Sequence, residues 1–437
     1  MTDDLPVGWA RAAVEDLISG RGVFSDGDWV ESKDQDPNGD VRLIQLADVG
    51  VGEFRNRSNR FLTSTKAKEL NCTYLEPQDV LVARMPDPLG RACMFPSRLG
   101  SCVTVVDVAI LRPGSEFIDP AWLMWSINSP QCGHQIAALQ SGTTRKRISR
   151  KRLATIELTV PPLSEQKRIV AAIEEHFARL DTADRDVSAA EAKIAALSSA
   201  AVSQLFLKEW PTRKIGELAR VGSGATPKRS ETRYWSNGTI PWVTSGAVNR
   251  RSIVSAAELI TDGALAETSV RLWPAGTVLV AMYGEGKTRG KAAVLEFEST
   301  CNQACAAIDY DRSLLNGSYL LAYLDARYEA TRRLGFGGVQ PNLSLGLIRS
   351  MEIPVPSLET QESVALQAED ITQKSSHLLD MCTMARRHAA ALRRSILAAA
   401  FSGRLVRQNP SDESASAPLE CIAPSKLKRL ERRKATA

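Results

Sequence analysis

Two long stretches of the chain carry apolar side chains that recur every seven residues between polar ones, without proline or glycine. The first runs from Gln166 to Phe206 and the second from Gln361 to Phe401. A seven-residue repeat corresponds to 3.5 residues per turn, which is typical of helices that pair along a narrow seam. A lone helix with so narrow an apolar stripe is marginal in water. The pattern therefore predicts two long helices that pair with each other.

The bulky apolar residues of the two stretches occupy complementary positions in the repeat. In the first stretch they lie mainly at one position of the seven-residue repeat, the one that Ile173 occupies. In the second stretch this position begins at Ala368, and the bulky residues lie mainly three residues after it, starting at Ile371. An antiparallel pairing brings these positions together, so that bulky side chains meet. The alternative, in which each helix packs only on its own neighbouring domain, stays open here. The predicted seam of an antiparallel coiled coil consists of Ile173, Leu180, Val187, Ile194, Leu197, Ile371, Leu378, Leu392 and Ile396.

Both helical stretches belong to an internal repeat of the sequence. ISRKRLATIELTVPPLSEQ begins at Ile148, and LSLGLIRSMEIPVPSLETQ begins at Leu343. At one constant offset, without a gap, the match continues until Phe206 aligns with Phe401. The segment before each copy matches the other only in outline. Two similar connectors therefore carry two different domains, which is typical of a protein that reads two different things at a fixed separation.

The segments before the two connectors have the pattern of mixed α and β structure. Each opens with Trp and a short helix pattern, continues through strand-like runs such as Asp79–Ala83 and Thr277–Ala281, and closes in an aromatic helix. The predicted class is α+β, with a pseudo-two-fold repeat of two mixed domains joined by two long helices. The predicted domains are a first mixed domain over 1–147, a first connector with its helix over 148–207, a second mixed domain over 208–342, a second connector with its helix over 343–406, and a disordered basic tail over 407–437.

Length and composition fit a globular protein of several domains. The chain has 437 residues and a net charge of +5, which permits binding to a polyanion without requiring it. The N-terminal residues lack the apolar run of a secretory signal, and no apolar stretch is long enough to predict a membrane span. The cysteines form no CxxC pair, so we expect buried thiols in a reducing cytoplasm and no metal site.

The sequence contains no recognisable catalytic motif. Gly284–Thr288 reads GEGKT, but Ala281 occupies the place of the first glycine of a phosphate-binding loop, and strand-like residues follow where a helix is needed. An Asn-Pro-Pro-aromatic methyltransferase motif, a dinucleotide-binding glycine motif and a Ser/His/Asp set are all missing. We expect a non-catalytic chain that binds no cofactor itself.

Basic residues gather where the first mixed domain meets its connector, over Thr144–Arg152, and in predicted loops of both mixed domains. Arginine pairs bidentately with guanine edges, and further Lys and Arg side chains hold phosphates. For each single residue, a solvated surface charge is the alternative. The candidates for contact with DNA are Arg57, Arg60, Arg84, Arg91, Arg145, Lys146, Arg147, Lys228, Arg229, Arg233, Tyr234, Lys287, Arg289 and Lys291.

From Trp9 to about Val406 the chain resembles the specificity subunits of type I restriction-modification enzymes. The order of variable segment, long helix, variable segment and long helix is part of this resemblance. The first domain departs from the family pattern at one place: it has Arg145–Arg147 where the second domain has Gln340–Asn342. We therefore do not assign to the first domain the role that this turn has in the family. The motifs that carry the resemblance are VPPLSEQ at Val160, VPSLETQ at Val355, GVQPNLS at Gly338 and LAAAFSGRL at Leu397.

The resemblance implies two target-recognition domains, separated by the coiled coil, that each read one half of an asymmetric, bipartite DNA site. It also implies partners: two methyltransferase subunits, which use S-adenosylmethionine to methylate adenine, and restriction subunits, which use ATP and Mg. Such complexes serve bacterial defence in the cytoplasm of bacteria and archaea, with no membrane partner. A helix of this length spans about 60 Å at ~1.5 Å per residue, enough to hold two domains apart along a duplex.

Other functions remain open at this point. The chain could be the DNA-reading subunit of a methylation-only or other phage-defence system, a single-chain nuclease-methyltransferase, or a non-DNA scaffold with a coiled-coil core. The missing catalytic motifs count against the single-chain enzyme. The target bases stay open in every case, because arginines in loops do not reveal which base edge they face.

Overall fold

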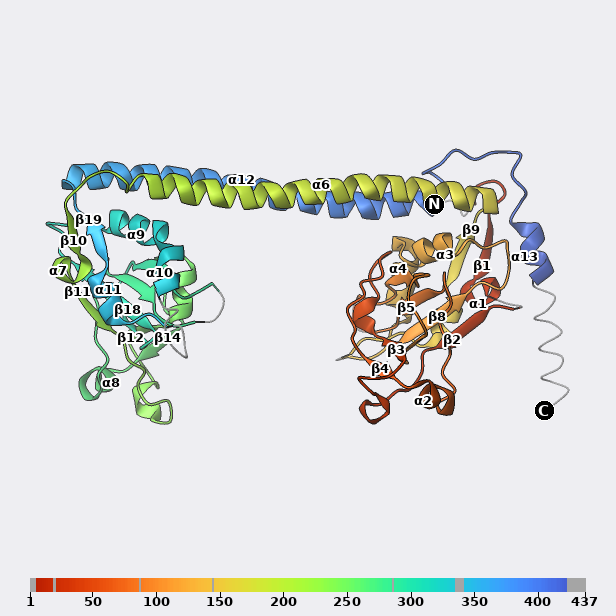
Figure 1. The fold of residues 1–437 in the computed structure, drawn as a ribbon, viewed down its shortest axis with the longest axis horizontal. Coiled ribbons are helices and arrows are strands. Elements are labelled where there is room, and N and C mark those ends of the chain that lie inside the picture. The colour runs from red at the N-terminus through yellow and green to blue at the C-terminus, as the bar shows by residue number, and fades with distance from the viewer. Residues whose placement is uncertain are drawn as a thin grey trace. The chain divides into compact units, whose positions relative to one another are not determined.

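The computed structural model of the chain describes residues 5–18, 21–85, 88–143, 145–284, 287–334 and 342–422. The chain divides into two compact units. Unit 1 contains the residues up to Asp186 and those from Ala385 onward, and unit 2 contains Val187–Met384. The two long helices, α6 (Leu163–Gln204) and α12 (Leu358–Ala400), each contribute one part to either unit (Figure 1). Each unit therefore combines one mixed domain with segments far apart in the sequence.

The first mixed domain, in unit 1, is built on small sheets. Its strands are β1 (Ala10–Ala13), β2 (Val23–Asp26), β3 (Val41–Ile44), β4 (Phe61–Leu62), β5 (Val80–Ala83), β6 (Ala92–Met94), β7 (Cys102–Thr104), β8 (Val108–Arg112) and β9 (Glu157–Val160). A four-stranded sheet has the order β2-β8-β5-β6, and a three-stranded sheet has the order β4-β3-β7. Strand β1 pairs antiparallel with β9, which ties the start of the domain to its connector.

Short helices surround these sheets, and their starts follow from local sequence. The helices of unit 1 are α1 (Val14–Leu17), η1 (Ser32–Asp34), η2 (Leu46–Asp48), α2 (Ser64–Glu69), α3 (Pro120–Ile127), α4 (Pro130–Leu139), α5 (Arg150–Ala154) and α13 (Ser416–Ile422). Helix α3 begins after Asp119, whose carboxylate accepts a hydrogen bond from the backbone N of Trp122 at 2.9 Å. A proline follows in its first turn, where the missing N–H costs nothing.

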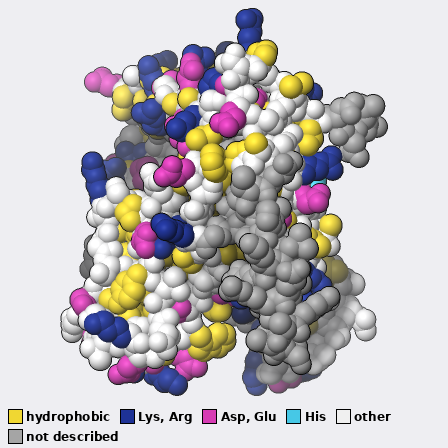
Figure 2. Space-filling model, turned by 90° about the vertical axis from the view of Figure 1, so that its right-hand side faces the viewer, with side chains coloured by type: hydrophobic (Ala, Val, Ile, Leu, Met, Phe, Trp, Pro, Cys, Tyr) yellow, Lys and Arg dark blue, Asp and Glu magenta, His cyan; other side chains and the backbone are white. Residues whose placement is uncertain are grey.

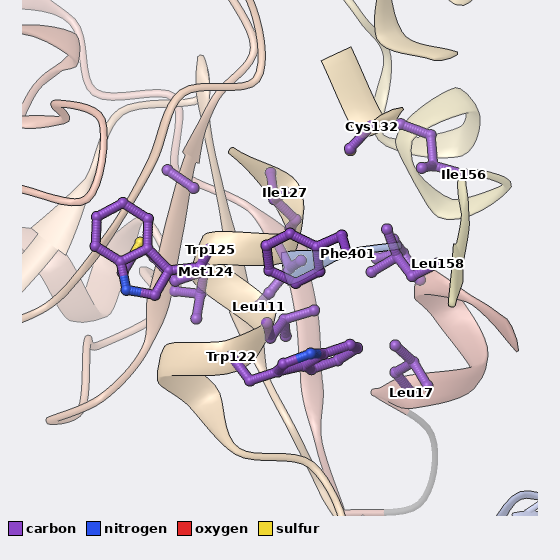
Figure 3. Close-up of a cluster of buried hydrophobic side chains, with 14 of the residues drawn as sticks. Leu17, Leu111, Trp122, Met124, Trp125, Ile127, Cys132, Ile156, Leu158 and Phe401 are labelled. Atoms are coloured by element: carbon purple, nitrogen blue, oxygen red, sulfur yellow. The ribbon is translucent and has the colours of Figure 1, made fainter. Parts of the chain in front are cut away.

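The core of unit 1 includes a residue from near the other end of the sequence. Phe401, directly after α12, lies 6.3 Å between ring centroids from Trp122, which is fully buried. Figure 3 shows Phe401 among Trp122, Leu111 and Ile127. This contact explains why the LAAAFSGRL run has an aromatic residue at this place. The first mixed domain is complete only when the end of α12 packs on it.

The second mixed domain, in unit 2, repeats this plan. Its strands are β10 (Thr212–Lys214), β11 (Ala219–Ser223), β12 (Ile240–Val243), β13 (Ser252–Ile253), β14 (Glu258–Ile260), β15 (Val278–Ala281), β16 (Ala292–Leu295), β17 (Thr300–Cys301), β18 (Cys305–Tyr310) and β19 (Glu352–Pro354). The sheets have the orders β11-β18-β15-β16-β13 and β14-β12-β17, and β10 pairs with β19. The helices are α7 (Ile215–Leu218), η3 (Thr232–Tyr234), η4 (Ser245–Asn249), α8 (Asp262–Glu267), α9 (Gly317–Ala326), α10 (Tyr328–Leu334) and α11 (Leu345–Ser350). The predicted α+β class and internal repeat are confirmed.

One glutamine in each connector attaches the mixed domain to its long helix. Gln166 accepts a hydrogen bond from Asp119 N at 2.9 Å and donates to the carbonyls of Phe117 and Pro161, both at 3.0 Å. Its counterpart makes the same three kinds of contact: Gln361 accepts from Asn316 N (2.8 Å) and donates to Leu314 O (3.0 Å) and Pro356 O (2.9 Å). In these contacts both glutamines bond backbone atoms, so these hydrogen bonds do not depend on which side chains the attached domain carries.

Helices α6 and α12 pair antiparallel within each unit. In unit 1, Arg393 of α12 lies over the ring of Phe177 and meets Asp184 of α6 at 3.3 Å, and Thr159 of β9, just before α6, donates to the Phe401 carbonyl, just after α12, at 3.2 Å. In unit 2, Val202 of α6 packs with Ala368 of α12 in one cluster. The predicted pairing of the two helices is therefore confirmed, and the alternative of two separate helices is excluded.

Most of the predicted seam residues lie between the helices. Ile173 is buried, Leu180 and Ile396 pack on the core of unit 1, and Ile371 packs beside Val202 in unit 2. Val187 and Ile194 are half-buried. All of these predicted seam residues except Ile371 occupy the same position of the seven-residue repeat as Ile173. Ile371 lies three residues after Ala368, which occupies that position in α12.

The other stripe of the predicted seam is wrong. Leu197, Leu378 and Leu392 are 59%, 45% and 52% exposed, so they lie outside the seam. Apart from Ile371, the second position that faces the partner helix lies four residues after the first position, not three. In α6 the less exposed residues at that position are Phe177, Asp184, Glu191 and Ser198.

An interhelical charge network explains this second stripe. In unit 1 the Arg393 guanidinium lies over the Phe177 ring, 5.1 Å from its centroid, and bonds Asp181 at 2.6 Å and Asp184 at 3.3 Å. A charged residue at the seam is partly removed from water, which costs free energy, and the ion pair with the other helix offsets this cost. Apolar periodicity alone cannot reveal a stripe that polar residues occupy.

The prediction of a disordered tail is wrong for residues 407–422. Asp412 pairs with Arg168 of α6 at 2.6 Å, and Ala415 N donates to the Gly8 carbonyl at 3.0 Å. Ala415 is buried, and Leu419 of α13 packs against the core of unit 1. A few apolar residues within a Ser- and Pro-rich segment are enough here, because the lead-in to α6 offers them an apolar surface. Residues 423–437 lie outside the described residues.

Candidate nucleic-acid interface

The described residues offer no site for a bound metal. Seven described cysteines are unpaired thiols, and Cys301 and Cys305 are buried. No group of three or more His, Cys, Asp or Glu side chains in the described part of the chain could hold a metal ion. No helix among these residues is both long and apolar enough to cross a membrane. The exposed basic side chains are therefore the candidates for a binding site.

Two basic candidates of the first mixed domain lie on its surface. Arg57 and Arg60 are exposed, and Arg60 donates to the Gln35 amide oxygen at 3.1 Å. The guanidinium of Arg57 has no partner among the described residues, because its only hydrogen bond is made by its backbone N. Both side chains are therefore available to a nucleic acid.

Two other candidates of this domain serve its internal structure. Arg84 is only 13% exposed; it pairs with Asp26 at 3.2 Å and donates to the carbonyls of Val106 and Ile148. Arg91 donates to three backbone carbonyls, including that of Val49 at 2.8 Å, and burial together with the nearby Arg55 lowers its pKa. Because their guanidinium groups are already engaged, neither residue remains a candidate for direct contact with DNA.

The basic run at the first junction is exposed. Arg145, Lys146 and Arg147 all reach solvent, and the backbones of Ser141 and Arg147 exchange two hydrogen bonds of 2.9 Å that close a turn. Thr144, the first residue of the predicted run, lies outside the described residues. The turn presents three adjacent cations, an arrangement suited to phosphate oxygens.

In the second mixed domain, a loop before β12 carries arginines stacked on aromatic rings. The Arg229 guanidinium lies 3.8 Å from the Trp235 ring centroid and 4.8 Å from that of Trp242, and it bonds both carboxylate oxygens of Glu258, one at 3.1 Å. This hydrogen-bonded pair raises the pKa of Arg229 and lowers that of Glu258. The side chain of Arg229 is 52% exposed, so one edge of the stack remains open to solvent.

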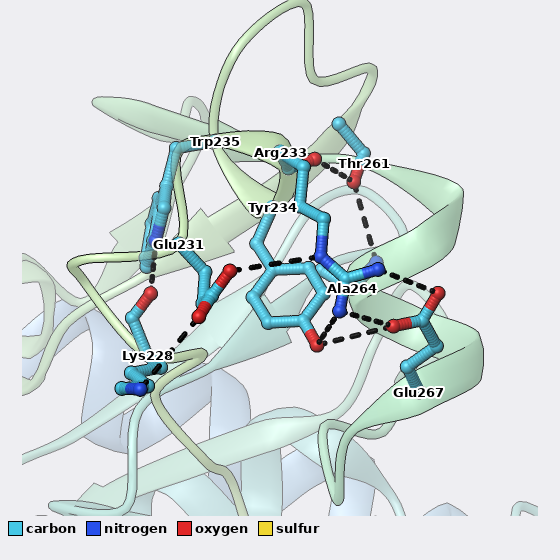
Figure 4. Close-up of polar contacts among 8 residues, drawn as sticks. All are labelled: Lys228, Glu231, Arg233, Tyr234, Trp235, Thr261, Ala264 and Glu267. Carbon is cyan, nitrogen blue, oxygen red and sulfur yellow. Dashed lines mark hydrogen bonds and ion pairs between the residues drawn. The ribbon is translucent and has the colours of Figure 1, made fainter.

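The neighbouring cations of this loop are also paired with carboxylates. Arg233 bonds Glu267 at 2.9 Å and Glu231 at 3.7 Å, and Lys228 lies 3.6 Å from Glu231 (Figure 4). Tyr234 is buried, and its hydroxyl donates to Glu267 at 3.2 Å. Tyr234 is therefore part of the scaffold and no longer a candidate, while Lys228, Arg229 and Arg233 remain exposed cations held in place.

The remaining candidates follow β15. Lys287 is exposed, whereas Arg289 is only 7% exposed and is no longer a candidate. Lys291 donates to the Asn249 amide oxygen at 3.1 Å. Nearby, Arg251 bonds Asp325 at 3.0 Å and Glu369 of α12 at 3.2 Å, so it links the mixed domain to the long helix.

Sequence reasoning missed the acidic partners of these cations. Glu231, Glu258 and Glu267 come from separate segments that only the fold brings together, and the sole signal in the sequence is the three-residue spacing of Lys228 and Glu231. On the face shown in Figure 2, Lys and Arg side chains are likewise interspersed with Asp and Glu. The cations of the loop before β12 therefore lie beside carboxylates and do not form a purely positive patch.

Comparison with known proteins places the chain in a family. The family described as "Type I restriction modification DNA specificity domain" matches twice, over residues 31–186 and 207–372. The type I restriction enzyme MjaIX specificity subunit of Methanocaldococcus jannaschii is 31% identical over 162 residues, 36% of this chain and 37% of that protein. The EcoR124I/EcoR124II specificity subunit of Escherichia coli is 25% identical over 159 residues, 36% of this chain and 39% of that protein. The matched region thus spans less than two fifths of either relative.

Two solved structures share the fold. A chain from a structure of complex assembly and conformational transition in the type I R-M system has a TM-score of 0.72 at 19% identity, with 92% of this chain and 100% of that chain covered. The HsdS subunit of Thermoanaerobacter tengcongensis has a TM-score of 0.53 at 18% identity, with 92% and 98% covered. With two family matches that cover most of the sequence, the chain belongs to the type I restriction-modification DNA specificity family.

Proposed function

We propose that this chain is the DNA-reading subunit of a type I restriction-modification enzyme, and that each mixed domain reads one half of a bipartite, asymmetric site. The observation that carries the proposal is the repeated attachment through Gln166 and Gln361, which holds each domain by backbone atoms. A connector of this kind accepts domains with different loops. Two unlike domains on equivalent connectors are suited to two unlike half-sites.

The proposal includes the partners of such an enzyme. Two methyltransferase subunits would supply adenine methylation with S-adenosylmethionine, and restriction subunits would supply cleavage with ATP and Mg. This chain would contribute recognition without catalysis, in the cytoplasm of a bacterium or archaeon. The direct test is to purify the chain with its methyltransferase partners and select bound duplexes from a random pool. Two conserved blocks separated by a fixed gap are expected, and a pool without enrichment would contradict the proposal.

Duplex binding is expected to weaken steeply as salt rises, and residues 423–437 should carry much of that response. This segment contains six Lys and Arg residues and one Glu, so it holds the whole net charge of +5, and residues 1–422 balance at zero. Deleting it should reduce the slope of log affinity against log salt by up to about 5, at ~0.9 for each phosphate that the segment neutralises. Fluorescence anisotropy between low and physiological salt measures this slope.

The matched control keeps the charge of the segment and scrambles its order. This variant should bind as the unchanged chain does, because counterion release depends on charge and not on sequence. Both variants should still select the same two half-sites. An unchanged slope after the deletion would show that the segment does not contact DNA.

A further inference from the structure

A short loop of the first mixed domain, Arg55–Arg60, presents arginine and asparagine side chains to solvent. Its sequence is RNRSNR, and every side chain in it except that of Ser58 is exposed. Arginine pairs bidentately with guanine and asparagine with adenine in the major groove. The loop therefore displays the side chains that distinguish purines. Exposure alone does not make a loop suited to base recognition, because a flexible loop loses conformational entropy when it becomes ordered on binding.

A buried carboxylate fixes the backbone of this loop. Asp48, at the end of η2, is fully buried. Its Oδ1 accepts from the backbone N of Arg57 at 2.6 Å and of Ser58 at 2.8 Å, and its Oδ2 accepts from Gln45 N at 2.8 Å and from the Ser58 hydroxyl. Burial opposes the charge of Asp48, but these hydrogen bonds outweigh it and lower its pKa, so the group is ionised at neutral pH.

Further hydrogen bonds hold the loop against β3. The Ser58 carbonyl accepts from the Arg42 guanidinium at 2.7 Å, the Arg60 carbonyl accepts from Leu43 N at 2.9 Å, and Arg55 N donates to the Asp48 carbonyl at 2.8 Å. The backbone is thus bonded at both ends and in the middle. Its exposed side chains project from a rigid frame, which lowers the entropic cost of ordering them against a ligand.

We propose that the Arg55–Arg60 loop reads bases in the half-site bound by the first mixed domain, and that Asp48 is the positioning residue that holds it in place. The inference rests on the proposed function of the chain as a DNA-reading subunit. It deepens that function, because it assigns base recognition to this loop, while Arg84 and Arg91 are engaged inside the same domain. The Arg145–Arg147 turn remains available for phosphates.

The test uses the whole chain with its methyltransferase partners and competitor duplexes altered in one half-site at a time. Arg57→Ala removes a guanidinium that has no partner among the described residues, so folding should be unaffected. It should reduce discrimination at one base pair of one half-site on the order of 10- to 100-fold, the effect of removing one bidentate pairing. The other half-site serves as the internal control and should be read as before.

Asp48→Asn should reduce the discrimination between base pairs at several positions of the same half-site, because it removes the hydrogen bonds that fix the Arg55–Arg60 loop. The matched control is Asp79→Asn. Asp79 is equally buried, but its carboxylate accepts from Arg112 at 2.6 and 2.8 Å and from Glu76 N at 2.8 Å, and these partners lie outside the Arg55–Arg60 loop. Both variants should lower the melting temperature, and only Asp48→Asn should relax the half-site.

The outcomes separate the two proposals. If the unchanged chain with its partners selects no duplex, the proposed function fails. If the unchanged chain selects both half-sites, and Arg57→Ala and Asp48→Asn select them equally well, the loop is not the reader and only this inference is overturned. Relaxation of the half-site by Asp79→Asn to the same degree would also overturn it, because general loosening of the domain would then explain the effect.

Discussion

Replacing the second mixed domain, about Trp210 to Asn342, with that of a relative is expected to change one half of the recognised DNA site and leave the other half unchanged. The domain has its own apolar cores, built around residues such as Tyr319 and Trp273. Gln361 holds it through backbone atoms at Asn316 and Leu314, which any domain of this fold can present. Selection of duplexes from a random pool, before and after the exchange, measures both half-sites.

Side-chain contacts with the long helices also affect the exchange. Arg251 of the second mixed domain bonds Glu369 of α12 at 3.2 Å, so the incoming domain should carry a cation there. Phe206, which follows α6, packs on Tyr319 and Tyr323 with ring centroids 5.2 and 5.4 Å apart, so the incoming helix should carry large side chains there. The reciprocal control replaces the first mixed domain and keeps the second, and it should change only the other half-site. A change of both half-sites after either exchange would show that the domains do not read independently.

Adding one heptad to each long helix is expected to widen the gap between the two half-sites without changing their sequences. Helices α6 and α12 are continuous over 42 and 43 residues, and both are shared by the two units. Seven residues lengthen a helix by roughly 10 Å at about 1.5 Å per residue. Along a duplex this corresponds to about three base pairs at ~3.4 Å each. Methylation-site mapping or duplex selection gives the new gap.

The control insertion has two residues in each helix. Seven residues keep both stripes of the seam in phase, whereas two residues rotate Ile173 and its successors away from the partner helix and break the Arg393 network. The two-residue variant should therefore lose folding or activity. A folded and active seven-residue variant with the original gap would mean that something other than helix length sets the separation.

Several features of this protein could be read from its sequence because they depend on local periodicity. The seven-residue repeat predicted both long helices and the position shared by Ile173 and Ile194, because side chains spaced at 3.5 residues per turn stay on one side of a helix and can line a seam. The internal repeat predicted two domains of one fold. Gln166 and Gln361 are identical residues at aligned positions of the internal repeat. Their hydrogen bonds to backbone carbonyls 49 and 47 residues away could not be predicted, because a sequence pattern does not show which distant backbone atoms the fold brings close.

Only the tertiary structure decided which polar residues are engaged and which are free. Leu197 and Leu392 are apolar residues at a seam position of the repeat, yet both are exposed, and next to Leu392 it is Arg393 that pairs across the helices, with Asp181 and Asp184. Arg84 and Arg57 are both arginines in predicted loops, and the sequence does not distinguish them. In the structure Arg84 lies inside the domain, whereas Arg57 projects from a loop held by Asp48. Hydrophobic burial follows a residue's type and period, whereas a hydrogen bond or ion pair depends on partners that only the folded chain brings within reach.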